Sequence, residues 1–192
     1  MSDKTKVTLN AEKARREFLK LASTAGLTLS PCSMLPVQAK TYMSTEQAQQ
    51  LLLPDKPLTK VDVSLTDNQK KSIQSASKVR VRSKKLKAWR SDAGDWFLLE
   101  QIIGKHENID IAFALDSQGR VIGMEILTYR ETYGHEIRHP KWRAQFHGRG
   151  SDERLKLDKQ IKNISGATLS CRHVTDGVNR ITKTWEFVLQ HL

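Results

Sequence analysis

A short stretch of small and hydroxyl-bearing residues precedes the last long helical pattern of the chain. It reads Ile-Ser-Gly-Ala-Thr-Leu-Ser over residues 164–170. Its glycine, Gly166, can adopt a backbone conformation that other residues avoid. The first N–H groups of a helix lack partners inside the helix and carry the positive end of its dipole, so a phosphate group fits there. The stretch therefore indicates either a phosphate site or a simple N-cap, because Ser and Thr cap many helices.

The helix that must position this stretch is predicted from about Leu169 to Gln190. After Cys171, apolar residues recur at spacings of three and four, which is typical of one buried helical face. They are Val174, Val178, Ile181, Trp185, Val188 and Leu192. Cys171 lies on this apolar stripe, which favours a buried thiol over a reactive one. Arg172 follows Thr168 by one turn, where it either pairs with a bound phosphate or stays a solvated surface side chain.

The sequence Ser165-Gly166-Ala167-Thr168, followed by Leu-Ser and a long helix, resembles the flavinylation motif of the FMN-binding domain family. That family includes the covalently flavinylated subunits of sodium-translocating NADH:quinone reductase and of Rnf-type electron-transport complexes. The resemblance implies that Thr168 carries FMN through a phosphoester bond, installed by an ApbE-type flavin transferase. The family motif usually has an acidic residue three positions before the serine, and this chain has Lys162 there.

The first 39 residues are predicted to be a targeting segment rather than part of the fold. Arg15 and Arg16 precede Phe-Leu-Lys and then an uncharged run over residues 21–39, which resembles a twin-arginine export signal. Gly26 and Pro31 interrupt the run, which disfavours a membrane-spanning helix. Cleavage is expected after Ala39, leaving a mature domain over residues 40–192 in the periplasm. The alternative is an amphipathic N-terminal helix of a cytosolic protein.

The rest of the chain predicts an α+β domain with an antiparallel sheet, two helices before the sheet and a long C-terminal helix packed against it. Ser44 with Gln47, and Thr66 with Gln69, have the spacing of capping boxes that begin short helices. Strands are predicted over 60–65, 96–103, 109–115 and 120–129. Residues 116–119 form the turn between the last two, so we expect a meander of three or four strands.

Polar residues crowd the end of the last predicted strand, where loops often build sites on a rigid sheet. In the family that the chain resembles, a Glu-Thr-x-Gly segment at this place lies near the flavin. The resemblance therefore implies that Glu131, Thr132 and Gly134 line the isoalloxazine pocket. Trp142 and Phe146 follow on a short helix that Pro140 opens, and core packing is favoured over flavin stacking for both.

The chain is strongly basic, with a formal net charge of +11. Basic residues concentrate over residues 78–90, where Val79 and Val81 alternate with charges as in an edge strand with one charged face. A solvated face, a docking surface for an acidic redox partner or anionic lipid, and a nucleic-acid site are the open interpretations. The last is disfavoured because Trp89 is the only aromatic residue nearby.

Other chemistry finds little support in the sequence. His135, His139, His147 and His173 suggest a metal, but Pro140 breaks the helical spacing of the first pair, so metal binding is disfavoured. Neither a P-loop nor a dinucleotide fingerprint occurs. We therefore expect a periplasmic flavoprotein with covalent FMN that shuttles electrons between membrane and periplasmic carriers such as cytochromes. The alternatives are a flavin-free binding or assembly module of the same fold, and a reductase with noncovalent FMN.

Overall fold

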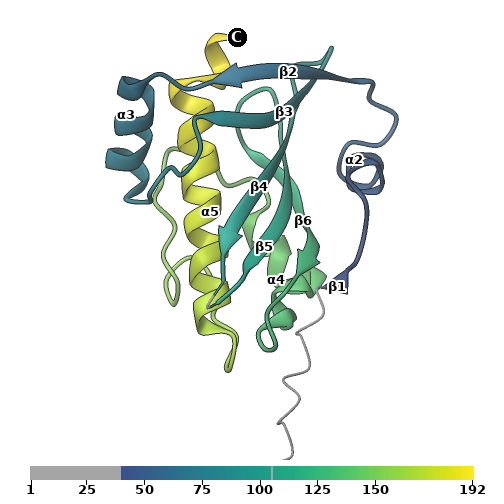
Figure 1. The fold of residues 1–192 in the computed structure, drawn as a ribbon, viewed down its shortest axis with the longest axis vertical. Helices are drawn as coiled ribbons and strands as arrows, with labels where there is room; N and C mark the ends of the chain where they lie inside the picture. Colours follow the sequence, from purple (N-terminus) through teal and green to yellow (C-terminus); the bar gives the residue numbers. More distant parts are fainter. Residues whose placement is uncertain (1–39, 105) are drawn as a thin grey trace, which may run out of the picture. The chain divides into compact units, whose positions relative to one another are not determined.

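Six antiparallel strands form one sheet in the order β1-β6-β5-β4-β3-β2 (Figure 1). The strands are β1 (Lys40–Thr41), β2 (Leu58–Ser64), β3 (Lys85–Ser91), β4 (Trp96–Ile103), β5 (Asn108–Leu115) and β6 (Val121–Tyr129). The computed structural model describes residues 40–104 and 106–192. The predicted export signal over residues 1–39 lies outside the described residues.

Helices cover both faces of this sheet (Figure 1). They are α2 (Thr45–Leu52), α3 (Asp67–Ser77), α4 (Pro140–Arg143) and α5 (Thr168–Phe187), with 3-10 turns η1 (His135–Arg138), η2 (Ala144–Phe146) and η3 (Leu189–His191). Both predicted capping boxes are present, at Ser44 and at Thr66. The fold is the expected single α+β domain with a long C-terminal helix.

The alternation of side chains along β5 explains why the two helical layers differ. Ile109, Ile111 and Phe113 are fully buried in the hydrophobic cluster beneath α5. The intervening Ala112 and Ala114 belong to a second, smaller cluster that packs against α2. Small residues on that face let a short helix approach the sheet closely, while the bulky face fills the space beneath α5.

One feature of the predicted fold was wrong, namely the edge position of the basic strand. The basic segment begins as a loop, and its strand β3 is an interior strand that pairs with both β2 and β4. The two predicted short helices are present as α2 and α3, with β2 between them in the chain. The predicted meander is present as β4, β5 and β6, and β3, β2 and β1 extend the sheet on its two sides. Long-range pairing of this kind leaves little local signal.

Helix α5 connects the core to the predicted phosphate site. Val174, Val178 and Ile181 on its apolar stripe are fully buried. Gly177 lies against β4, since a Cβ atom there would come 2.3 Å from the Cδ1 atom of Ile102. The helix is thus fixed along its length, and its N-terminal turn has a defined position relative to the sheet. Among the described residues, no helix is both long enough and apolar enough to span a membrane.

Candidate functional site

The N-terminus of α5 is open rather than capped. Its N-cap residue is Ala167, and no side chain in the described part of the chain accepts a hydrogen bond from the first turn. The simple N-cap interpretation is therefore wrong for Ser165, which is exposed, and for Thr168, which is the first helical residue. Gly166 has φ +85°, and a Cβ atom placed there would meet no atom within 4 Å. The first turn of α5 thus lacks a side-chain acceptor and begins beside the open space at Gly166, two features that favour a phosphate site.

The Thr168 hydroxyl is held by a side chain from the preceding loop. Asn163 donates a hydrogen bond from Nδ2 to Thr168 Oγ1 at 3.0 Å. Its other polar atom, Oδ1, is buried and has no hydrogen-bond partner among the described residues. A donor on Oγ1 fixes the rotamer of Thr168, and it leaves the hydroxyl hydrogen free to point toward a base. Asn163 is therefore a positioning residue for the hydroxyl.

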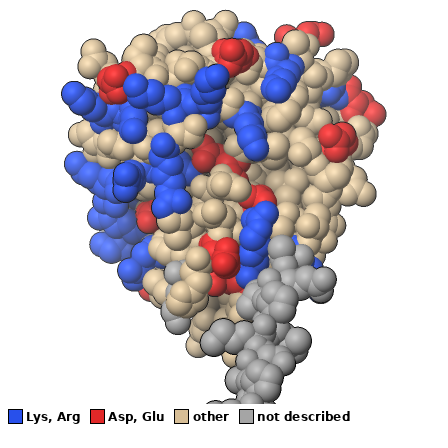
Figure 2. All heavy atoms as spheres, viewed as in Figure 1, with Lys and Arg blue, Asp and Glu red and all other residues tan. Residues whose placement is uncertain are grey.

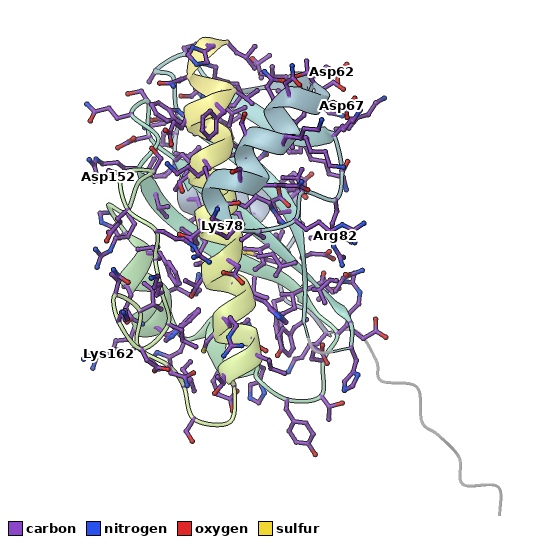
Figure 3. All side chains as sticks on the ribbon, turned by 90° about the vertical axis from the view of Figure 1, so that its left-hand side faces the viewer. Asp62, Asp67, Lys78, Arg82, Asp152 and Lys162 are labelled. Atoms are coloured by element: carbon purple, nitrogen blue, oxygen red, sulfur yellow. The ribbon has the colours of Figure 1, made fainter. Side chains whose placement is uncertain are left out.

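Trp142 and Gln145 fix the loop that leads into the site. The Trp142 indole donates to the Lys162 carbonyl at 2.7 Å, and Gln145 Oε1 accepts from the Lys162 N–H at 2.7 Å. Trp142 and Phe146 are buried, as predicted for core residues. The Lys162 side chain itself is exposed and lies on the loop beside α5 (Figure 3). Both backbone groups at this motif position are thus held, while its charged group remains in solvent.

The loop after β6 meets the first turn of α5 through Gly134. This glycine has φ +89°, and a Cβ atom there would lie 2.6 Å from Ser170 Oγ and 2.7 Å from the Tyr129 hydroxyl. The Tyr129 hydroxyl donates to the Tyr133 carbonyl and lies 3.1 Å from Ser170 Oγ. Because the single phenol hydrogen goes to the carbonyl, Ser170 is the donor in the second contact. Burial raises the pKa of Tyr129, so this donor stays protonated.

The structure therefore brings the end of the segment over residues 131–134 against Ser170 in the first turn of α5, directly after the segment over residues 165–168. Within the first segment the side chains differ in orientation. Glu131 accepts backbone hydrogen bonds from His106 at 2.5 Å and from Glu107 at 2.9 Å, so its carboxylate holds the turn between β4 and β5. Thr132 is exposed. Gly134, the third residue predicted to line a flavin pocket, lies against α5 at Ser170.

Two predicted residues on α5 lie on different sides of the helix surface. Arg172 is exposed, one turn after Thr168, where its guanidinium is accessible to an anion bound at the helix N-terminus. Cys171 is fully buried and burial raises the pKa of its thiol, which confirms the prediction of a buried thiol.

Three residues near the site were missed by the sequence analysis. Tyr133 is 81% exposed and Leu169 is 41% exposed, and both adjoin the contact between Gly134 and Ser170. Exposed apolar side chains beside a polar site offer a surface on which a flat ring can lie. Asn163 is the third. In the sequence, Asn163 is distinguished only by its position five residues before Thr168. This spacing is too weak a signal to predict the hydrogen bond between the two side chains.

The histidines do not gather around a common point. His139 caps α4 by accepting from the Lys141 N–H at 3.3 Å. His173 lies on α5, where its Nδ1 is buried without a hydrogen-bond partner in the described part of the chain. Within residues 40–104 and 106–192, no group of three or more His, Cys, Asp or Glu side chains is arranged to hold a metal ion.

The fold and the site define a single α+β domain in which the uncapped N-terminus of α5 lies beside a loop with an exposed aromatic residue. Residues 104–183 match the family model described as FMN-binding domain. The match extends from the turn before β5 through most of α5, so it includes both segments that meet at Gly134. It supports the FMN-binding domain family and indicates a flavin-binding protein with FMN as its cofactor. No curated protein matches the chain.

The residues at the α5 N-terminus fit the phosphate end of FMN. The unpaired first-turn N–H groups suit phosphate oxygens, and the space around Gly166 admits the group. The orphaned Oδ1 atom of Asn163 can accept a hydrogen bond from a hydroxyl-bearing ligand chain. Arg172 adds a positive charge one turn away. The donor set is therefore that of an anion site with a neighbouring apolar surface.

Proposed function

We propose that the protein is a periplasmic flavoprotein that carries FMN covalently on Thr168 and transfers electrons between membrane and periplasmic redox partners. The observation that carries the proposal is the uncapped N-terminus of α5, which begins with an accessible threonine inside the matched segment. FMN, when bound, supplies a carrier that exchanges one or two electrons.

The chain's own residues would position and shield the cofactor. The first-turn N–H groups and Arg172 would bind the phosphate, and Asn163 would orient Oγ1 of Thr168. Tyr133 and Leu169 would contact the ring system and exclude water from one side of it. The packing of Gly134 on Ser170 would keep these two exposed residues at a fixed separation.

Attachment requires an activated flavin donor and an external base. The bond from Thr168 Oγ1 to phosphorus forms while a phosphoanhydride bond breaks, so a flavin adenine dinucleotide would supply the group and AMP would leave. No described carboxylate or imidazole is hydrogen-bonded to Oγ1, whose one contact is Asn163. We therefore assign the base that removes the hydroxyl proton to an ApbE-type flavin transferase.

The periplasmic location rests on the twin-arginine-like sequence of residues 14–39. A cofactor tethered by a covalent bond cannot diffuse away outside the cytoplasm, which makes attachment and export mutually consistent. Partners such as acidic cytochromes would be attracted by the basic surface over residues 78–90. Figure 2 shows Lys and Arg side chains gathered on the side of the molecule where Figure 1 shows α3.

The test is co-expression with a flavin transferase in a host that exports folded proteins, followed by denaturation and mass measurement. We expect one added FMN mass that stays with the denatured wild-type chain and with Thr168→Ser, since both keep a hydroxyl. Thr168→Ala should lose it. Ser165→Ala is the matched control and should retain the added mass.

Lys162 favours one competing function that the same experiment detects. A positive side chain replaces the usual acidic residue at this motif position, and it is exposed where a transferase would approach. If the transferase needs the acidic group, the wild-type chain stays colourless and the proposal fails, leaving a flavin-free binding module. Flavin that is released on denaturation would instead identify a noncovalent FMN reductase. Recovery of attachment in Lys162→Asp would assign the loss to this residue.

A further inference from the structure

The sheet opens between β3 and β4, far from Thr168. The two strands pair from Lys87 with Leu99 to Arg90 with Trp96. Beyond this point, Lys85 and Leu86 pair only with β2, while residues 100–103 of β4 pair only with β5. The two strands therefore diverge, and a cavity of about 470 Å³ lies at the opening. This volume is in the range of pockets that bind small molecules, about 300–1,000 Å³.

The apolar part of the cavity is drawn from both hydrophobic clusters. Leu65, Val81, Leu86 and Ile111 come from the cluster beneath α5, and Leu99 and Leu127 come from the sheet face that α2 covers. Because the cavity reaches apolar side chains on both faces of the sheet, it is deeper than a surface depression. It can bury the apolar body of a ligand.

The polar part of the cavity carries uncompensated positive charge. Arg82, Lys85 and Lys87 line it and are exposed, and no ion pair to a described carboxylate neutralises any of the three. The two carboxylates in the lining already have cationic partners. Glu100 pairs with Arg180 at 2.7 Å, and Asp110 pairs with Arg130 at 2.7 Å. The cavity therefore offers cations without competing anions.

This cavity is separate from the α5 N-terminus. Its α5 residues are Arg180 and Thr184. At a rise of about 1.5 Å per residue, Arg180 lies about 18 Å along the helix from Thr168. Its three free cations also lie outside residues 104–183, the segment that matches the FMN-binding domain family. Figure 3 shows Arg82 and Lys162 on opposite sides of α5.

We propose that this cavity is a second ligand site, which binds a small amphipathic organic anion. The apolar body of the ligand would enter between the diverging strands, and its carboxylate or phosphate would meet Arg82, Lys85 and Lys87. The chemistry selects against neutral and cationic molecules of the same shape, since only an anion gains the charge-assisted contacts.

The test is a titration of the full-length chain with naphthalene-2-carboxylate, followed through the methyl NMR signals of Leu86, Leu99 and Ile111. We expect saturable shifts of these signals at one site. Naphthalene-2-carboxamide has nearly the same shape without the charge and should bind at least about tenfold more weakly, since charge-assisted hydrogen bonds contribute about 1.5–3 kcal/mol. The result should be the same in Thr168→Ala, because this site does not depend on flavin attachment.

A pair of double variants separates local recognition from net charge. Arg82→Gln with Lys87→Gln removes two cations from the cavity, and should weaken carboxylate binding about tenfold. Lys70→Gln with Lys71→Gln removes the same charge from α3, outside the cavity lining, and should leave binding within about twofold. Equal weakening by both variants, equal affinity for the carboxamide, or the absence of saturable shifts would each overturn the proposal.

Discussion

Thr168 and Ser165 are both hydroxyl residues of the same short motif, and their surroundings decide which one suits attachment. Ser165 is exposed in the turn before α5, and it is not part of the first helical turn, where the positive end of the helix dipole lies. Thr168 begins the helix, and its Oγ1 accepts a hydrogen bond from Asn163. A phosphate joined to Thr168 would therefore remain beside the first-turn N–H groups, whereas one joined to Ser165 would not be held there.

Replacing Asn163 tests whether the hydroxyl must be oriented. In Asn163→Ala, Thr168 loses its donor and its rotamer is no longer fixed, so we expect flavin attachment to slow by about tenfold, the effect of about 1.4 kcal/mol. Folding stability should change by less than about 1 kcal/mol, because the variant also removes the orphaned Oδ1 atom. Time-resolved mass spectrometry with purified transferase measures the rate. An unchanged rate would mean that the transferase alone orients Thr168.

Gly134 provides a residue-scale test of the contact between the loop and α5. Gly134→Ala introduces both a left-handed alanine and a Cβ atom within 2.7 Å of two hydroxyl oxygens. Gly148→Ala is the matched control, since φ is +74° there and no atom lies within 4 Å of the added carbon. We expect the control to lose about 1 kcal/mol of unfolding free energy, and Gly134→Ala about 2 kcal/mol more. Urea denaturation measures the unfolding free energy of both variants. Equal losses would show that the loop moves away from Ser170 without a cost in stability.

At the scale of elements, α5 serves the site at one end and the core along its length. Its apolar stripe lies on the sheet, while Asp176 lines a separate, smaller pocket together with His173 and Arg180. Burial raises the pKa of the Asp176 carboxyl, and this effect exceeds the opposing electrostatic influence of the basic side chains around it. The helix therefore carries a carboxylate whose ionisation the folded state disfavours.

This raised pKa predicts a pH-dependent effect of Asp176→Asn. The stabilising contribution of Asp176 is complete below its unfolded pKa, near 4, and is lost as the pH rises through its higher folded pKa. Asparagine does not ionise, so the stability of the variant relative to wild type should increase as the pH rises over this window. Urea denaturation at a series of pH values measures the difference. Asp92→Asn, at an exposed position, is the control, and a similar trend there would refute the assignment.

The 3-10 and α-helical turns after β6 hold the loop that leads into the site. The Trp142 indole and the Gln145 side chain hold the backbone of Lys162 from both sides. These two contacts link the core cluster to the loop that carries Asn163. The loop can therefore present Asn163 to Thr168 at a fixed distance although it has no regular secondary structure.

At the scale of the whole molecule, charge is unevenly distributed. The loop from Lys78 and the start of β3 carry exposed cations, and the ion pair of Lys84 with Asp67 engages one of them. Such a surface attracts acidic partners over distances comparable to the Debye length, which is about 8 Å at physiological ionic strength. Exposed charges of this kind change association rates more than they change stability.

Electron transfer to an acidic cytochrome should therefore depend strongly on salt. We expect the bimolecular rate constant of the flavinylated protein to fall about tenfold or more between about 0.01 M and 0.15 M ionic strength. Lys78→Glu with Arg80→Glu should lower the low-salt rate and flatten the salt dependence. Lys40→Glu with Lys159→Glu makes the same charge change at exposed positions outside residues 78–90. Stopped-flow absorbance measures the rates, and equal effects of the two variants would exclude a specific docking surface.

The sequence by itself determined the features that depend on local patterns. The sequence predicted the capping boxes at Ser44 and Thr66, the strand alternation of Ile109, Ile111 and Phe113, and the buried stripe of α5. Each of these features depends on the spacing of residues that are close together in the chain. The motif at Ser165–Thr168 also indicated a resemblance to the FMN-binding domain family from consecutive residues, and the match over residues 104–183 supports that resemblance. Such signals survive without knowledge of the fold because each involves neighbours along the chain.

Only the tertiary structure decided what depends on residues that are distant in the chain. The interior position of β3, the use of Glu131 to hold the β4–β5 turn, and the contact of Gly134 with Ser170 all join distant segments. The cavity between the strands arises because β3 separates from β4 at Lys87. No residue type in the sequence indicates this separation. Pairing partners are set by the packing of the whole sheet, and this is why the sequence offered candidate residues for the site but not their geometry.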